Sequence, residues 1–217
     1  VVFRPMQEEL DANLKTQFKQ QLSIAEINLE NYIKQQINET KSLTSRTMIR
    51  KKLAQYKTGK LKLQDLKEYT HPKYSDGVKI LKNILGAYRI SEQELIASWG
   101  NTETIKLKEY YHLNSKTTTV KISLAEDLLV IAAPIYQDEN LLGYDIASFD
   151  LKNSLKQLNT GDIRYQLTDD SDLSLGFKET SQNLKSLRQI LDTNYYLKAV
   201  MSKDNLYQTV NHFYILI

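Results

Sequence analysis

The sequence contains no cysteine, only three histidines and only seven glycines among its 217 residues. The lack of cysteine excludes disulfides, thiolate metal sites and cysteine nucleophiles. The histidines lie far apart, without the short spacing of metal-binding pairs, so no metal site is expected. No GxSxG, P-loop or GxGxxG motif is present, and so few glycines leave little for a phosphate-binding loop. We therefore expect a non-catalytic segment with no cofactor and no bound metal.

Charge of one sign and long apolar runs are also scarce. The formal net charge is +3 and no dense block of lysine and arginine is present, so nucleic acid is not an expected partner. The most basic stretch, Arg46 to Lys52, is explained by one solvated helix face. The sequence contains no run of about 20 apolar residues, which is the length needed to span a membrane, and no signal peptide is present. The apolar ends, Val1–Phe3 and Tyr214–Ile217, predict a segment between two flanking transmembrane helices, the alternative being an arbitrary piece of a soluble protein.

A long helix is predicted at the start of the chain. Met6 to Thr40 contains neither glycine nor proline, and its apolar residues recur every three or four positions, at Leu10, Leu14, Phe18, Leu22, Ala25, Leu29, Tyr32 or Ile33, and Ile37. At a rise of about 1.5 Å per residue this helix would be roughly 50 Å long, more than a small domain needs. The stripe could pack on the chain's own sheet, form the seam of a parallel homodimer, or do both.

Shorter elements follow this helix. Helices are expected over Lys41–Tyr56 with Gly59 as a C-terminal cap, over Lys62–Tyr69 stopping before Pro72, and over Ser75–Leu85 closed by Gly86. Strands are expected over Ala87–Gln93, Glu94–Trp99, Thr117–Ser123, Leu128–Tyr136 and Leu141–Phe149, with a turn at Asp138–Asn140. A helix over Leu151–Leu158, capped by Asp150, ends this part of the chain.

A smaller unit is expected after Asn159–Gly161. Its pattern gives strands over Ile163–Thr168, Leu173–Phe177 and Tyr195–Met201, and helices over Leu184–Leu191 and Lys203–Ile217. The acidic run Asp169–Asp172 could hold Ca²⁺ but lacks the distal glutamate of the full motif, so a solvated turn is favoured. The chain is thus expected to comprise a helical part (1–60), a larger α+β domain (61–159) and a small α/β module (160–217).

Several segments of the sequence resemble the Cache (PDC, PAS-like) sensor domains of histidine kinases, diguanylate cyclases and chemoreceptors. They are Ser45–Arg50, Tyr56–Gly59, Tyr88–Ile90 with Ser98–Gly100, and the hairpin Leu129–Tyr136 with Leu142–Ile146. The resemblance implies an α+β fold in which a long N-terminal helix packs on a PAS-like antiparallel sheet, with residues 160–217 as the membrane-proximal module of a double Cache sensor. It also implies an extracytoplasmic (periplasmic) location, and signalling by ligand binding or helix displacement.

Asp145 is the leading candidate for ligand contact. Alternation along the strands predicts one face with Gly143, Asp145, Ala147 and Phe149, beside Val130, Ala132, Pro134 and Tyr136 of the preceding strand. A carboxylate among small apolar residues is costly unless a cation pairs with it. Asp145 could therefore receive a ligand amine, or it could pair with Lys121, Arg89 or a backbone amide.

Aromatic residues near the sheet complete the candidate site. Tyrosine offers apolar area and a polar tip, which suits recognition, so Trp99, Tyr111 and Tyr136 join the candidates, with Tyr110 and Tyr144 nearby. Arg89 could bind a ligand carboxylate bidentately or form an ion pair between elements. Cache domains that bind amino acids carry an Arg-x-Trp-aromatic run, and the corresponding Lys106–Tyr111 lacks that Arg and Trp. This departure puts an amino-acid ligand in doubt.

The function predicted from these features is an extracytoplasmic signal-sensing domain of a transmembrane protein, most simply a sensor histidine kinase, with a small organic ligand. The alternative is a docking or structural module that reads a periplasmic binding protein and has no small-molecule pocket. A third possibility is a helical adaptor from a cytosolic protein.

Overall fold

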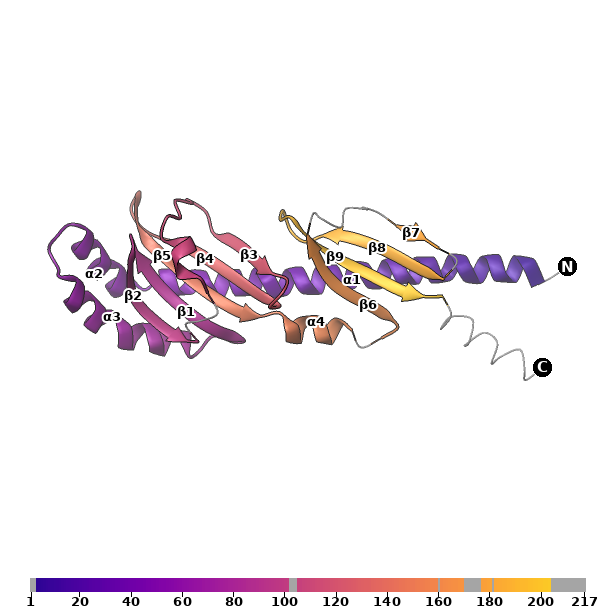
Figure 1. Cartoon of the computed structure of the whole chain (residues 1–217), viewed down its shortest axis with the longest axis horizontal. Helices are drawn as coiled ribbons and strands as arrows, with labels where there is room; N and C mark the ends of the chain where they lie inside the picture. Colours follow the sequence, from indigo (N-terminus) through magenta and orange to yellow (C-terminus); the bar gives the residue numbers. More distant parts are fainter. Residues whose placement is uncertain (1–2, 102–104, 160, 170–176, 181, 204–217) are drawn as a thin grey trace. The chain divides into compact units, whose positions relative to one another are not determined.

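The computed structural model describes residues 3–101, 105–159, 161–169, 177–180 and 182–203 (Figure 1). These residues form two compact units. One contains residues 33–151, and the other contains residues 1–32 together with 152–217.

Helix α1 (Phe3–Thr44) matches the long helix expected from the sequence. Its apolar stripe is buried within the single chain, since Phe18, Leu22, Ala25, Leu29 and Ile33 are each below 5% exposed. The stripe therefore packs within the chain and is not open to a second copy. Among the described helices, none has a stretch that is long and apolar enough to cross a membrane.

Helices α2 (Thr47–Lys57) and α3 (Leu63–Val78) follow. Gly59 lies just beyond α2 with φ +71°, as its expected cap position requires. The expectation of separate helices over 62–69 and 75–85 is wrong, because α3 runs through Pro72 and ends before Ile84. Its residues Leu66, Thr70, Tyr74 and Val78 lie four apart and are fully buried. This packing outweighs the backbone hydrogen bond that proline removes.

A five-stranded antiparallel sheet forms the centre of the unit 33–151, and all five strands expected there are confirmed. The strands are β1 (Ile84–Ser91), β2 (Glu94–Gly100), β3 (Thr119–Ser123), β4 (Leu128–Gln137) and β5 (Asn140–Asp150). Their spatial order is β2-β1-β5-β4-β3. A short 3₁₀ helix, η1 (Leu107–Tyr110), lies between β2 and β3 in the chain.

The β4–β5 hairpin corrects the face assigned to Asp145. Gln137 pairs with Asn140 across the turn, but a bulge then skips Leu142, so that Ile135 pairs with Gly143. Asp145 consequently pairs with Ala133 and not with Ala132. Because one extra residue moves every later side chain to the opposite face, Asp145 does not share a face with Val130, Ala132 or Pro134.

The second unit has a four-stranded sheet in the order β6-β9-β8-β7. Its strands are β6 (Ile163–Asp169), β7 (Lys178–Glu179), β8 (Asn183–Gln189) and β9 (Tyr195–Ser202), and the helix α4 (Lys152–Leu158) precedes them. The helix expected over 184–191 is wrong, since β8 pairs with β9 and alternates buried Leu184 and Ser186 with exposed Lys185. Pairing with the next strand thus overrides the local three-residue spacing of leucines. Almost all of the acidic run, the strand expected at 173–177 and the terminal helix lie outside the described residues.

Candidate functional site

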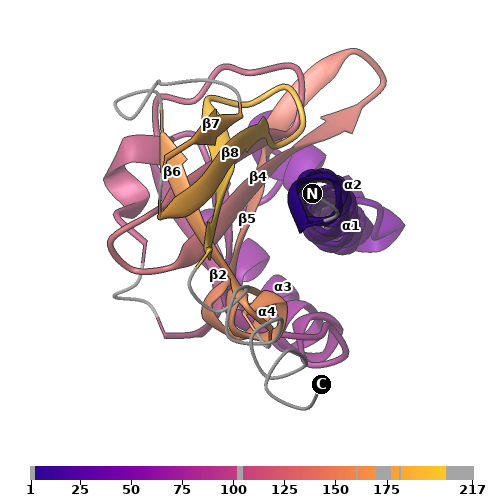
Figure 2. The ribbon, with the colours of Figure 1, turned by 90° about the vertical axis from the view of Figure 1, so that its right-hand side faces the viewer.

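The two faces of the five-stranded sheet have different coverings. Leu43 of α1, Leu53 of α2, and Leu66, Tyr74 and Val78 of α3 pack on one face. The segment around η1 packs on the other, through Leu107, Tyr110, Tyr111 and Leu113. Figure 2 shows α2 on one side of β4 and β5. The candidate residues of the sheet therefore divide between the helix-covered face and the η1-covered face.

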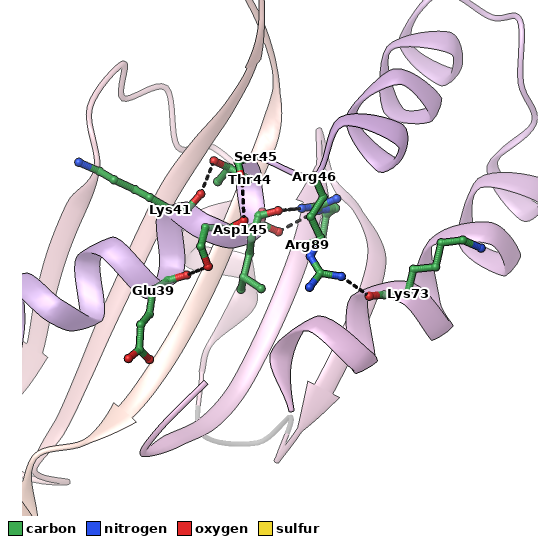
Figure 3. Close-up of polar contacts among 10 residues, drawn as sticks. Glu39, Lys41, Thr44, Ser45, Arg46, Lys73, Arg89 and Asp145 are labelled. Carbon is green, nitrogen blue, oxygen red and sulfur yellow. Dashed lines mark hydrogen bonds and ion pairs between the residues drawn. The ribbon is translucent and has the colours of Figure 1, made fainter. Parts of the chain in front are cut away.

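The helix-covered face holds a buried ion pair between Arg89 of β1 and Asp145 of β5, which lie directly opposite each other in the sheet. Arg89 Nε donates to Asp145 Oδ1 at 2.8 Å, and its terminal nitrogen NH2 donates to Oδ2 at 2.6 Å. The same NH2 donates to the backbone carbonyl of Leu43 in the last turn of α1 at 2.8 Å. Figure 3 shows the paired side chains below the end of α1. The pair therefore ties two strands to one helix.

The pair is shielded from solvent. Arg89 is 1% exposed and Asp145 is fully buried. Burial alone would lower the pKa of Arg89, but the Asp145 carboxylate raises it above its usual value. Burial, with the nearby Asp145 charge, raises the pKa of the Tyr74 hydroxyl, whose ring lies 5.1 Å from the guanidinium carbon. The two opposite charges are thus paired within the protein, whereas the third guanidinium nitrogen, Arg89 NH1, is buried without a hydrogen-bond partner among the described residues.

The η1-covered face is mainly an apolar core. Its buried residues include Tyr88, Ile90, Val130, Ala132, Tyr144 and Ile146. The Tyr144 hydroxyl donates to the Ser115 carbonyl at 3.0 Å, and the Tyr88 hydroxyl donates to the Asn101 carbonyl. Burial raises the pKa of Tyr144, and the neighbouring Tyr136 adds to that shift. These bonds hold the segments on either side of η1 against the sheet.

A cavity of about 180 Å³ opens at the β3 side of this face. Its apolar lining consists of Leu128 and Val130 of β4, together with Ile105 and Tyr110. Its charged and polar lining consists of Lys106, Glu109, Lys121, Ser123 and Glu126. Lys121 Nζ lies 2.8 Å from Glu109 Oε2, and this bond lowers the pKa of Glu109. The cavity can therefore offer both a cation and an anion to a small ligand.

The structure separates the residues that the sequence placed in one site. Lys121 lines the cavity, and Tyr111 packs on the same face. Arg89 and Asp145 form the ion pair on the opposite face, where Trp99 also packs, against a cluster that contains Tyr74 and Ala87. Tyr136 lies near Tyr144, and its hydroxyl is buried without a hydrogen-bond partner among the described residues. Of the six candidates, only Lys121 lines the cavity itself.

The cavity also contains charged residues that sequence reasoning did not select, namely Lys106, Glu109 and Glu126. The sequence pattern indicated the β3 side of the cavity, but not these three residues. Lys121 and Ser123 alternate along β3 on the face of Val130 and Leu128, so a polar patch on an otherwise apolar face was readable. The partner Glu109 comes from the irregular segment, whose path no periodicity predicts.

Solved sensor domains share this fold, although no family model and no curated protein matches the sequence. The sensor domain of the histidine kinase DctB from V. cholerae superposes with a TM-score of 0.63 at 11% identity, covering 88% of this chain and 98% of that chain. The ligand-binding domain of the Pseudomonas fluorescens chemoreceptor CtaA, in complex with L-leucine, gives 0.59 at 11% identity, covering 94% and 99%. The ligand-binding domain of the Pseudomonas aeruginosa PAO1 amino acid chemoreceptor PctC, in complex with GABA, gives 0.55 at 12% identity, covering 82% and 95%.

These likenesses extend over most of both chains, and they include the long first helix and the two antiparallel sheets. The Cache resemblance seen in the sequence is confirmed at the level of the fold. The chain has the α+β fold of the extracytoplasmic Cache (PDC) sensor domains of histidine kinases and chemoreceptors.

Proposed function

We propose that this chain is the extracytoplasmic, non-catalytic sensing domain of a membrane-anchored signalling protein, most simply a histidine kinase, and that it binds a small organic ligand in the cavity beside η1. The observation that supports this most directly is the cavity with Lys121 and Glu109 at its wall, on the sheet face that no helix of α1–α3 covers. Structural neighbours that bind L-leucine and GABA support a ligand of this size.

The cavity's size and charge narrow the ligand class. A volume of about 180 Å³ is below the roughly 300–1,000 Å³ of pockets that hold drug-sized molecules, so the ligand is metabolite-sized. Lys106 and Lys121 favour a carboxylate, and Glu109 and Glu126 favour an ammonium group. The absence of the Arg and Trp of amino-acid-binding Cache domains means that any carboxylate contact here relies on lysine. We propose a small organic acid or a zwitterion.

A thermal-shift screen of amino acids and small carboxylic acids should find a compound that raises the melting temperature of the chain. Binding to the folded state alone stabilises it by mass action, by about 2.7 kcal/mol at a hundredfold excess over Kd. Lys121→Ala should weaken binding of the hit at least tenfold in calorimetry, because it removes the charged partner of a carboxylate.

Lys116→Ala is the matched control, since Lys116 is an exposed lysine outside the cavity lining. It should leave affinity unchanged. Equal affinity of both variants and the native chain would place the ligand elsewhere, and a broad library without any hit would favour the docking module over the small-molecule sensor.

We also propose that the chain forms a parallel homodimer through α1, but through its outer face. Ile24 and Ile27 are 59% and 52% exposed. They belong to a row with alternating four- and three-residue spacing that carries no charge: Asn13, Gln17, Gln20, Ile24, Ile27 and Asn31. Such spacing is the heptad seam of a coiled coil, in which amide side chains on the seam favour a parallel pair in register.

Sedimentation should detect this dimer at high protein concentration. The double substitution Ile24→Lys with Ile27→Lys should weaken self-association at least tenfold, because it places four like charges on the seam. Ile80→Lys changes another exposed isoleucine and should have no effect. A native chain that stays monomeric at all concentrations would rule out association of this segment alone.

A further inference from the structure

The basic residues of this chain are concentrated in one stretch. Between Glu39 and Asp65 there is no acidic residue, and this stretch contains eight basic ones: Lys41, Arg46, Arg50, Lys51, Lys52, Lys57, Lys60 and Lys62. The whole chain has a formal charge of +3, so the remaining residues sum to −5. The positive charge of the protein is therefore a local property of α2 and its flanking connections.

Most of these cations are not neutralised within the chain. Lys57 pairs with Glu92 at 2.8 Å, and Lys52 lies 5.5 Å from the ring centre of Tyr69. Arg50, Lys51, Lys60 and Lys62 form no ion pair among the described residues. Ile49 and Leu53 anchor the opposite side of α2 in the core. The helix thus presents its cations outward from a fixed position.

A groove of about 320 Å³ opens beside this basic surface, between the start of α2 and α3. Its lining is Arg46, Thr47, Met48, Ile49, Lys73 and Asp76. Met48 is 56% exposed, although it is large and apolar. The groove thus places an exposed methionine beside two cations, Arg46 and Lys73, and one carboxylate, Asp76.

Arg46 is held in place at this groove. Its NH1 donates to the Lys73 carbonyl of α3 at 2.7 Å, as Figure 3 shows. Its guanidinium lies directly over Gly77, where an added Cβ would fall 2.0 Å from NH2. Lys73 Nζ lies 4.0 Å from the ring centre of Tyr69. The two cations that flank Met48 are therefore positioned before any partner arrives, which reduces the entropy lost on binding.

We infer that α2 and this groove form a docking surface for an acidic protein, one that presents carboxylates around a single apolar side chain. The apolar side chain would contact Met48, and the carboxylates would meet Arg46, Lys51 and Lys52. Arginine and methionine are enriched at the centres of protein interfaces, and methionine adapts its shape to a partner. Complementary charge of this kind steers encounter and sets specificity.

The apolar groove argues for a protein over a polyanion. A nucleic acid, an acidic polysaccharide or an anionic membrane surface would be bound by the lysines and arginines alone, and would gain little from Met48. A protein partner gains from both. This surface does not include any residue of the cavity beside η1, so the docking proposal can be tested independently of the ligand proposal.

Selection from a random peptide library displayed on phage tests this surface, with the purified native chain as bait. Selected peptides should be enriched in aspartate and glutamate around a leucine, methionine or phenylalanine. A synthetic peptide of that kind should bind about tenfold more weakly when NaCl rises from about 0.05 to about 0.5 M. Lys51→Glu with Lys52→Glu, and separately Met48→Ser, should each weaken binding at least tenfold.

Lys116→Glu with Lys185→Glu reverses two exposed lysines elsewhere and should leave peptide affinity unchanged, as should Lys121→Ala. Circular dichroism and melting curves verify that each variant is folded. The inference is overturned if no acidic-apolar peptide is selected, or if Met48→Ser binds as the native chain does. It is also overturned if heparin or anionic phosphatidylglycerol vesicles bind equally to the native chain and to Met48→Ser and compete away the peptide, because the surface is then a polyanion or membrane site.

Discussion

Asp145→Ala will lower the free energy of unfolding of the unit 33–151 by about 3–5 kcal/mol, because it leaves the Arg89 guanidinium buried without its counter-ion. Arg89 is 1% exposed, and its remaining strong acceptor would be the Leu43 carbonyl. The only tryptophan, Trp99, packs within the same unit. Urea unfolding followed by Trp99 fluorescence therefore measures this loss where it occurs.

An exposed pair gives the matched control. Glu92→Ala breaks the contact with Lys57, in which Glu92 is 61% exposed, and it should cost less than about 1 kcal/mol. Replacing both Arg89 with methionine and Asp145 with leucine should recover much of the loss, since no unpaired charge is then buried. A cost below about 1 kcal/mol for Asp145→Ala would contradict the structural role given to this pair.

The Arg89–Asp145 pair also shows what the sequence could and could not reveal. Periodicity predicted the long helix, the five strands of the central sheet, and the strands β6 and β9 of the second sheet. Each of these elements has a regular spacing of apolar residues within its own segment of the sequence. The two alternatives for Asp145, a ligand contact or a partner such as Arg89, were both consistent with that pattern. The choice depends on the bulge at Leu142, and nothing in the local sequence requires a bulge there.

Long-range packing explains the other differences. Pro72 should end a helix on local grounds, but the buried row from Leu66 to Val78 keeps α3 continuous. The leucines of β8 have helical spacing, but pairing with β9 makes that segment a strand. The cavity required Glu109 and Lys121 to meet across an irregular segment. In each case the deciding contact joins two different elements, and the local pattern of one element does not specify which other element it packs against.

Gly143→Ala will also destabilise this unit, by about 3 kcal/mol, because the added methyl group has no space. A Cβ at this position would lie 2.1 Å from the backbone carbonyl oxygen of Ile90 and 3.2 Å from the Cα of Ser91. Both obstacles are backbone atoms of β1, so no side-chain rotation can relieve the clash. Relief requires β1 and β5 to separate, and this loosens the strand pair that carries Arg89 and Asp145. The close approach of β1 thus explains why the β4–β5 hairpin has a glycine at position 143.

Gly161→Ala is the matched control, because no heavy atom lies within 4 Å of its added Cβ. It should leave the Trp99-monitored urea midpoint unchanged, whereas Gly143→Ala should lower it and speed hydrogen exchange along β1 and β5. Combining Gly143→Ala with Asp145→Ala should cost less than the sum of the two single changes, since a separated strand pair has already lost part of the ion pair. Full additivity would mean that the methyl group is accommodated without moving β1, and would reject the steric account.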